Sequence, residues 1–100
     1  MANHLTHDMH PNSLEAYAKA TQALTGRRRM VHQLIEQHGP MSDRQVRDRL
    51  GFSDMNAVRP RISELVDLGL LEEVGRRQED GHTVRICGVP KFMGQLGLFS

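Results

Sequence analysis

Four stretches of the chain carry apolar residues three and four positions apart, which is the spacing of one face of a helix. The first stretch, residues 14–24, follows Ser13, whose hydroxyl could cap a helix by accepting a backbone hydrogen bond. Its apolar face is thin, with Leu14, Tyr17 and Ala18 near its start. We therefore expect a short accessory helix that leans on the rest of the domain or on a second copy of the chain.

A longer helix is predicted from Thr25 to about His38. Gly39 and Pro40 favour a stop there, because glycine accepts a left-handed terminal conformation and proline cannot continue a helix. The buried stripe of this helix would consist of Met30, Val31, Leu34 and Ile35.

A short helix is then predicted to begin at Ser42. Ser42 and Gln45 stand at the spacing of a capping box, in which two side chains satisfy backbone N–H groups at the start of a helix. Val46 and Leu50 would point inward, and Gly51 would end the helix.

The next stretch contains a conflict between apolar pattern and proline chemistry. A helix that starts near Ser53 or Asp54 would contain Pro60, which removes a backbone hydrogen bond and clashes with the preceding turn. Either the helix starts late, with Asn56 as its cap, or its first turn is kinked. Gly69 would end it, and its buried stripe would be Val58, Ile62, Leu65 and Val66.

After Gly69 the apolar period changes from that of a helix to that of a strand. A strand is expected to begin with Leu70, Leu71 and Val74. Residues 83–89 alternate β-branched side chains, and residues 78–81 (Gln-Glu-Asp-Gly) between the two runs are typical of a turn. The pattern predicts a β-hairpin.

The whole pattern fits one small domain over 25–90, with 13–24 as the accessory helix, because 100 residues leave little room for a second domain. Residues 1–12 and 91–100 lack an apolar period, so we expect a mobile arm and a C-terminal tail. Aromatic residues make up only 4% of the chain, and a core of Leu, Val, Ile and Met favours helices. The expected fold class is mainly α with a small β-hairpin: three core helices, a hairpin and a short extra N-terminal helix.

The charge and the residue composition limit the classes of function that the chain can have. The net charge is only +1, so a nucleic-acid surface would require basic residues to be sorted onto one face. All basic residues except Lys19 and Lys91 are arginine, which binds phosphates and guanine edges well, although an arginine-rich proteome would give the same composition. The single cysteine, Cys87, excludes an intrachain disulfide and a cysteine-based metal site. We expect no enzyme, no cofactor and no metal, and a protein of the cytoplasm with no membrane partner, because no apolar run has membrane-spanning length.

The order of these elements resembles the winged helix-turn-helix family. The resemblance lies in the segments GRRRMVHQLIEQHGPMSDRQVRDRLGF and VRPRISELVDLGLLEEVGRR, and it covers about residues 25–90. In that family the third helix lies in the major groove of DNA. The resemblance implies a sequence-specific protein that binds double-stranded DNA, such as a transcriptional regulator of phage or mobile-element type. Because winged domains also mediate protein–protein contacts, a dimerisation module, acting as a homodimer, is an alternative.

The resemblance also implies which residues would contact DNA. The base-reading candidates are Asn56, Arg59, Arg61 and Ser63, because asparagine can pair with adenine and arginine with guanine. Phosphate contacts would come from Ser42, Arg44 and Arg47 on the second core helix, from Arg27, Arg28 and Arg29 on the first, and from Arg76, Arg77 and Arg85 on the wing. Glu79 and Asp80 depart from the pattern, because cations are expected at the tip of a wing that enters a groove.

The C-terminal residues carry a second resemblance. Gln95-Leu96-Gly97-Leu98-Phe99 is similar to the short peptide by which bacterial polymerases and replication factors dock on the sliding clamp. Leu98 and Phe99 would fill an apolar pocket and Gln95 would bond at its rim. This implies a replication adaptor or inhibitor as a rival function. Alternatively, Leu96, Leu98 and Phe99 cover the core of their own domain.

Overall fold

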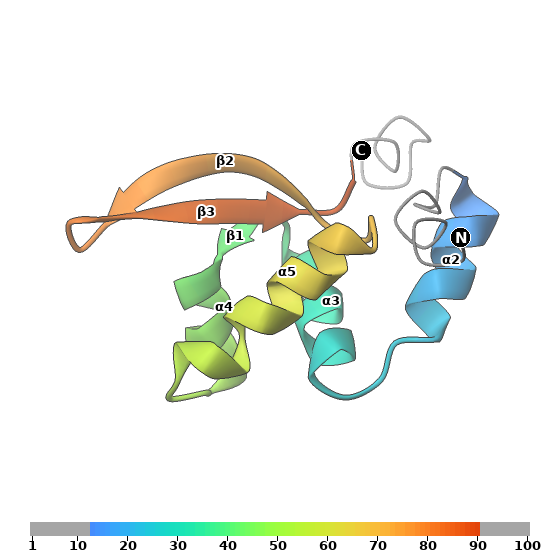
Figure 1. Ribbon diagram of the computed structural model, residues 1–100, viewed down its shortest axis with the longest axis horizontal. Helices are drawn as coiled ribbons and strands as arrows, with labels where there is room; N and C mark the ends of the chain where they lie inside the picture. The colour runs from blue at the N-terminus through green and yellow to red at the C-terminus, as the bar shows by residue number, and fades with distance from the viewer. Residues whose placement is uncertain (1–12, 91–100) are drawn as a thin grey trace, which may run out of the picture.

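The computed structural model describes residues 13–90, so the expected arm over 1–12 and the tail over 91–100 lie outside the described residues. The described part contains four α-helices, one 3-10 turn and a small antiparallel sheet. Figure 1 shows α3, α4 and α5 gathered beside the sheet, while α2 stands apart at one end. In chain order, the elements are α2 (Leu14–Gln22), α3 (Gly26–His38), β1 (Met41–Ser42), α4 (Asp43–Leu50), the 3-10 turn η1 (Met55–Ala57), α5 (Arg59–Asp67), β2 (Glu72–Glu79) and β3 (His82–Gly88).

The sheet has one strand more than the sequence predicts. β1 pairs with β3, with Met41 opposite Cys87 and Ser42 opposite Ile86, and the strand order is β1-β3-β2. A strand of two residues is too short to show an alternating pattern, and it forms only because the distant β3 offers it a partner. The sheet therefore has three strands, and not only the two strands of the expected hairpin.

The hairpin itself is confirmed, with a tighter turn than predicted. Asp80 and Gly81 form the turn, with φ of 52° and 79°. These left-handed values suit the two-residue turns that match the twist of paired strands, and Asp-Gly is a favoured sequence for them. Gln78 and Glu79 belong to β2 and pair with Thr83 and His82.

The first strand of the hairpin begins later than predicted. The backbone N–H groups of Leu70 and Leu71 both donate to the carbonyl oxygen of Leu65, at 2.9 and 3.2 Å, so these two leucines close the end of α5. β2 begins at Glu72 instead. Val74 lies at an irregularity in the pairing with β3, and its side chain is 44% exposed.

The predicted cap of α4 is confirmed. The Ser42 hydroxyl accepts from the backbone N–H of Gln45, and the Gln45 side chain accepts from the backbone N–H of Ser42. Gly51 ends α4 in the left-handed conformation with φ of 79°. This cap places Asp43 in the first turn of α4, where it becomes part of the groove described below.

The conflict at Pro60 is resolved by a late helix start. Asp54 caps the short turn η1 by accepting from the backbone N–H of Asn56, and α5 begins only at Arg59. Pro60 therefore lies in the first turn of α5, where no backbone N–H is required. Val58, and not the predicted Asn56, is the residue that precedes the helix.

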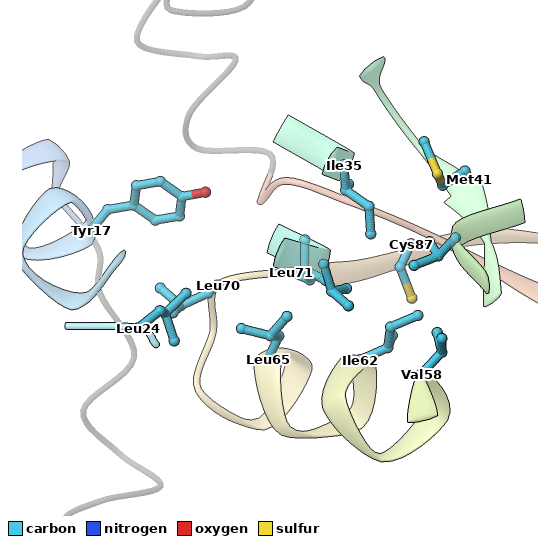
Figure 2. Close-up of a cluster of buried hydrophobic side chains, with 12 residues drawn as sticks. Tyr17, Leu24, Ile35, Met41, Val58, Ile62, Leu65, Leu70, Leu71 and Cys87 are labelled. Atoms are coloured by element: carbon cyan, nitrogen blue, oxygen red, sulfur yellow. The ribbon is translucent and has the colours of Figure 1, made fainter. Parts of the chain in front are cut away.

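The core lies between α3, α4, α5, β3 and the segment that links α5 to β2 (Figure 2). Val31 and Ile35 are buried as predicted, but Met30 is 44% exposed and His32 is buried. At 100° per residue, Met30 points more than 90° away from the direction shared by Val31 and Ile35, which explains its exposure. Among residues 13–90, no helix is both long and apolar enough to cross a membrane.

α2 packs on the rest of the described domain through buried Tyr17 and partly buried Ala20, and Leu24, which follows the helix, is buried as well. The Tyr17 hydroxyl lies 2.7 Å from Nε2 of the buried His32 on α3. Burial lowers the pKa of His32 and raises that of Tyr17, because it penalises the charged form of each. Leu14, expected on the apolar face, is 45% exposed.

Candidate nucleic-acid interface

An open groove runs between the β2–β3 hairpin and the starts of α4 and α5. It consists of two adjoining hollows of about 500 and 360 Å³, which share Met55, Arg59, Thr83 and Val84. Five arginines and three carboxylates line it, so positive groups outnumber negative ones by two. The arginines are Arg44, Arg47, Arg59, Arg76 and Arg85, and the carboxylates are Asp43, Glu73 and Asp80.

The folded chain thus brings six of the sequence-predicted residues to one place. Ser63 of α5 joins the five arginines in lining the groove. Arg59 lines both hollows and has a side chain that is 62% exposed. Its Nε lies 4.0 Å from Asp43, which is the longest ion-pair contact in the groove. Arg59 is therefore the groove arginine best placed to reach a ligand.

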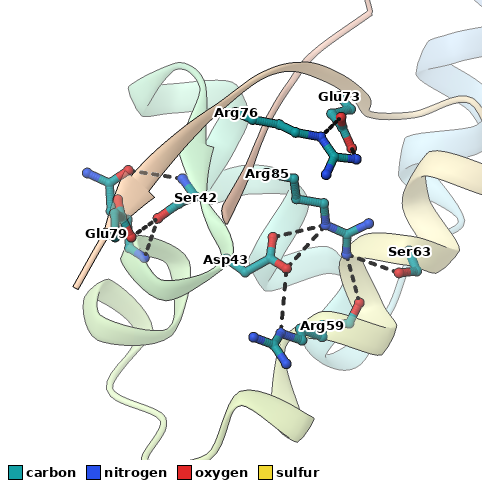
Figure 3. Close-up of polar contacts among 9 residues, drawn as sticks. Ser42, Asp43, Arg59, Ser63, Glu73, Arg76, Glu79 and Arg85 are labelled. Carbon is teal, nitrogen blue, oxygen red and sulfur yellow. Dashed lines mark hydrogen bonds and ion pairs between the residues drawn. The ribbon is translucent and has the colours of Figure 1, made fainter. Parts of the chain in front are cut away.

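Arg85, predicted to contact a phosphate from the wing, bonds mainly to groups within the protein. Its Nε donates to both carboxylate oxygens of Asp43, at 3.2 and 3.3 Å, and its Nη2 donates to the Ser63 hydroxyl and to the Arg59 carbonyl (Figure 3). With only 24% of its side chain exposed, Arg85 holds β3 against α4 and α5. It shapes the groove from inside and presents little of itself to a ligand.

Asp43 is the residue at the centre of this network. Its side chain is 8% exposed, and burial raises the pKa of its carboxyl although Arg85 and Arg59 both lower it. Asp43 was not among the residues predicted from the sequence. The available signal was its position directly after the capping Ser42, where a carboxylate suits a helix start.

The acidic tip of the hairpin, Glu79 and Asp80, lies against the start of α4. The Ser42 hydroxyl donates to Glu79 at 3.1 Å, and Arg44 pairs with the Asp80 carboxylate at 2.6 Å. Arg44 also donates to the backbone carbonyl of Glu79 at 3.4 Å. Arg77, predicted to contact DNA, pairs with the second oxygen of Glu79 at 2.7 Å.

Ser42, predicted to contact a phosphate, is engaged within the protein in the unbound structure. It is fully buried, its backbone N–H donates to Gln45, and its hydroxyl donates to Glu79. The helix cap and the hairpin tip together engage the backbone N–H and the hydroxyl of Ser42.

The remaining predicted residues do not line the groove. Arg61 donates to both oxygens of Glu64 at 2.9 and 3.1 Å, and Arg28 approaches the same carboxylate at 3.8 Å. The Arg27 guanidinium stacks over the Phe52 ring at 5.2 Å, and Arg29 donates to the carbonyl of Leu24. Asn56 is exposed on η1, one element before the helix on which it was predicted.

Within residues 13–90, no three His, Cys, Asp or Glu side chains stand close enough to hold a metal ion. Cys87 is fully buried, and burial raises the pKa of its thiol to about 11. A thiol in that state is a poor nucleophile.

Comparison with known proteins adds no family to this picture. No protein-family model matches the chain, and no curated protein matches it.

Proposed function

We propose that the protein binds double-stranded DNA in a sequence-specific way, as a winged helix-turn-helix protein whose recognition helix is α5 and whose wing is the β2–β3 hairpin. The order of helices and strands is consistent with a winged-helix-like arrangement. The observation that carries the proposal is the groove, in which arginines from α4, α5 and both hairpin strands line one surface. Because the chain has a net charge near zero, it can attract phosphates only where its arginines are gathered on one surface.

Within this proposal, Arg59 reads bases. It stands at the first position of α5, the part of a recognition helix that reaches base edges, and most of its side chain is exposed. Arginine can donate two parallel hydrogen bonds to guanine O6 and N7, and such a pair discriminates by about 1–3 kcal/mol.

Arg47 and Arg76 would hold phosphates on either side of Arg59. Arg76 pairs with Glu73 at 2.9 Å, but its side chain is 65% exposed, so this exposed pair is weak enough to be exchanged for a phosphate. Arg47 pairs with its neighbour Asp48 at 2.9 Å. We expect both to act independently of sequence, because phosphate contacts position the protein without reading bases.

The test is selection of bound duplexes from a random pool, followed by titration of the selected site and of a scrambled duplex. Arg59→Ala should weaken the selected site by about tenfold or more and the scrambled duplex much less. Arg47→Ala should weaken both alike and reduce the salt dependence by about one phosphate. Arg49→Ala is the matched control, because Arg49 is exposed on the same helix as Arg47 and does not line the groove. Absence of binding to any duplex at low salt would refute the proposal.

A second candidate function depends on the C-terminal motif. Gln95, Leu96, Leu98 and Phe99 lie outside the described residues, so the sequence alone supports it. We propose that this peptide docks on the bacterial sliding clamp, which would make the protein a replication adaptor or inhibitor. Purified clamp should be retained by the wild-type chain and lost from the Leu98→Ala, Phe99→Ala variant. Equal retention by both would show that the tail is irrelevant.

A further inference from the structure

The hairpin tip presents carboxylates to α4 at the place where a DNA-binding protein of this arrangement would receive phosphates. Asp80 pairs with Arg44 at 2.6 Å, and Glu79 accepts from the Ser42 hydroxyl at 3.1 Å. Both partners belong to the start of α4, whose backbone dipole also favours a negative group. A carboxylate pair here offers the oxygen acceptors and negative charge that a phosphate would offer.

The contact joins the hairpin tip to α4, which are separate elements. It can therefore open while both the hairpin and the helix stay folded. Arg44 lies 35 residues before Glu79 in the chain, and two acceptors of the tip share its guanidinium. The Asp80 side chain is 75% exposed and that of Arg44 is 30% exposed. An ion pair so accessible to water is worth little and can be exchanged for a phosphate.

We propose that the acidic tip formed by Glu79 and Asp80 is an autoinhibitory phosphate mimic, which occupies Arg44 until a DNA phosphate displaces it. This inference depends on the proposed function, because it describes how the same groove is regulated. The tip holds Arg44 at the edge of the groove in the unbound protein, and the phosphate backbone competes with it for Arg44. The tip therefore makes the protein bind DNA more weakly than it would with a free Arg44. Duplexes that do not place a phosphate at Arg44 fail to displace the tip.

The decisive variant is Asp80→Asn, tested on a random-sequence duplex of about 30 base pairs, three helical turns, at low salt. Asn-Gly is at least as good a two-residue turn as Asp-Gly, so the hairpin is preserved while the charge is lost. We expect the affinity to rise by about threefold, and by about tenfold in the Glu79→Gln, Asp80→Asn double variant. Glutamine at 79 can still accept from Ser42, so α4 keeps its contact with the hairpin.

Removing a negative charge near DNA raises affinity even without any special contact, and a double-mutant cycle with Arg44→Gln separates the two effects. If the tip acts by holding Arg44, the gain from Asp80→Asn disappears in the Arg44→Gln background. If the tip merely repels DNA, the gain persists there, and that result overturns the inference. An unchanged affinity in the Asp80→Asn protein overturns it as well.

The same experiment distinguishes failure of the inference from failure of the proposed function. If the wild type binds DNA but Asp80→Asn gives no Arg44-dependent gain in affinity, the autoinhibition is refuted and the proposed DNA binding stands. Binding by Asp80→Asn where the wild type shows none supports both. If neither protein binds any duplex, both the proposed function and the inference are refuted. The NMR signals of the Arg44 guanidinium then report whether the tip contact exists in the unbound protein.

Discussion

Replacing Arg85 with methionine should destabilise the protein far more than an ordinary surface substitution. Asp43 has a side chain that is only 8% exposed, and Arg85 donates to both of its carboxylate oxygens. Methionine keeps most of the length and apolar stem of arginine but removes every donor. The carboxylate would remain buried, with Arg59 at 4.0 Å as the nearest remaining charge of opposite sign.

The size of the effect follows from the burial of the pair. Breaking a buried ion pair by removing one partner typically costs about 3–5 kcal/mol, because the other charge is left without compensation. Arg85 is 24% exposed, so water already screens part of the interaction, and Arg59 compensates part of the loss. We therefore expect Arg85→Met to lower the free energy of unfolding by about 2–3 kcal/mol.

Urea unfolding at pH 7 measures this cost, and the hairpin offers a matched control. Arg76 also pairs with a glutamate, but its side chain is 65% exposed and that of Glu73 is 37% exposed. Arg76→Met should therefore cost no more than about 0.5 kcal/mol. Equal costs for the two substitutions would refute the argument that burial decides the value of the Arg85 pair.

The pH dependence gives a second measurement with a definite sign. A carboxyl whose pKa is raised by folding favours the folded state most below its unfolded pKa of about 4, and this contribution is lost as the pH rises through the folded pKa. Loss of Arg85 raises the pKa of Asp43 further, because its nearest opposite charge is gone. The cost of Arg85→Met should therefore be smaller at pH 4 than at pH 7. A cost that is independent of pH would contradict this account of Asp43.

Three further substitutions or reactions test other parts of the fold. Tyr17→Phe removes the hydroxyl that bonds to buried His32, and it should lower the free energy of unfolding by about 1–2 kcal/mol in urea titration; an effect near zero would mean that His32 finds another partner. Cys87 should react with a thiol reagent at pH 8 only when the chain is unfolded, because the thiol is buried and its pKa is raised to about 11; rapid labelling of the native protein would contradict this. Pro60→Ala should change stability by less than about 0.5 kcal/mol, because Pro60 lies in the first turn of α5, whereas a gain of several kcal/mol would place it in a helix interior.

Much of the fold could be predicted from the sequence because its signals are local. The capping box at Ser42, the left-handed Gly51 and the Asp-Gly turn each depend on residues within a few positions of one another. β1 could not be predicted in this way, because its two residues form a strand only against β3, some 45 residues later. The sequence pattern left the start of α5 open between a kink and a late start, and in the structure the helix starts late, directly after the buried Val58.

The candidate site was less predictable than the fold, for a related reason. The sequence identifies arginines but not their partners, and the partners decide which arginines can reach a ligand. Arg61 and Arg59 have the same residue type and lie two positions apart, yet Arg61 is engaged by Glu64 in two hydrogen bonds while Arg59 is 62% exposed. The pairing of Arg85 with Asp43 joins residues 42 positions apart, which no local pattern reports.

The attachment of α2 has a consequence for how the molecule loses its structure. Among the described residues, Tyr17 is the one side chain of α2 that is buried, with Ala20 partly buried beside it, and a helix of nine residues is too short to persist by itself. Proteins open in cooperative units whose local free energies can be well below that of global unfolding. We expect the backbone amides of α2 to exchange with solvent through such a local opening, while those of α3 and α5 exchange only when the whole domain unfolds. The molecule therefore has two stabilities, and a single melting temperature would describe only the larger one.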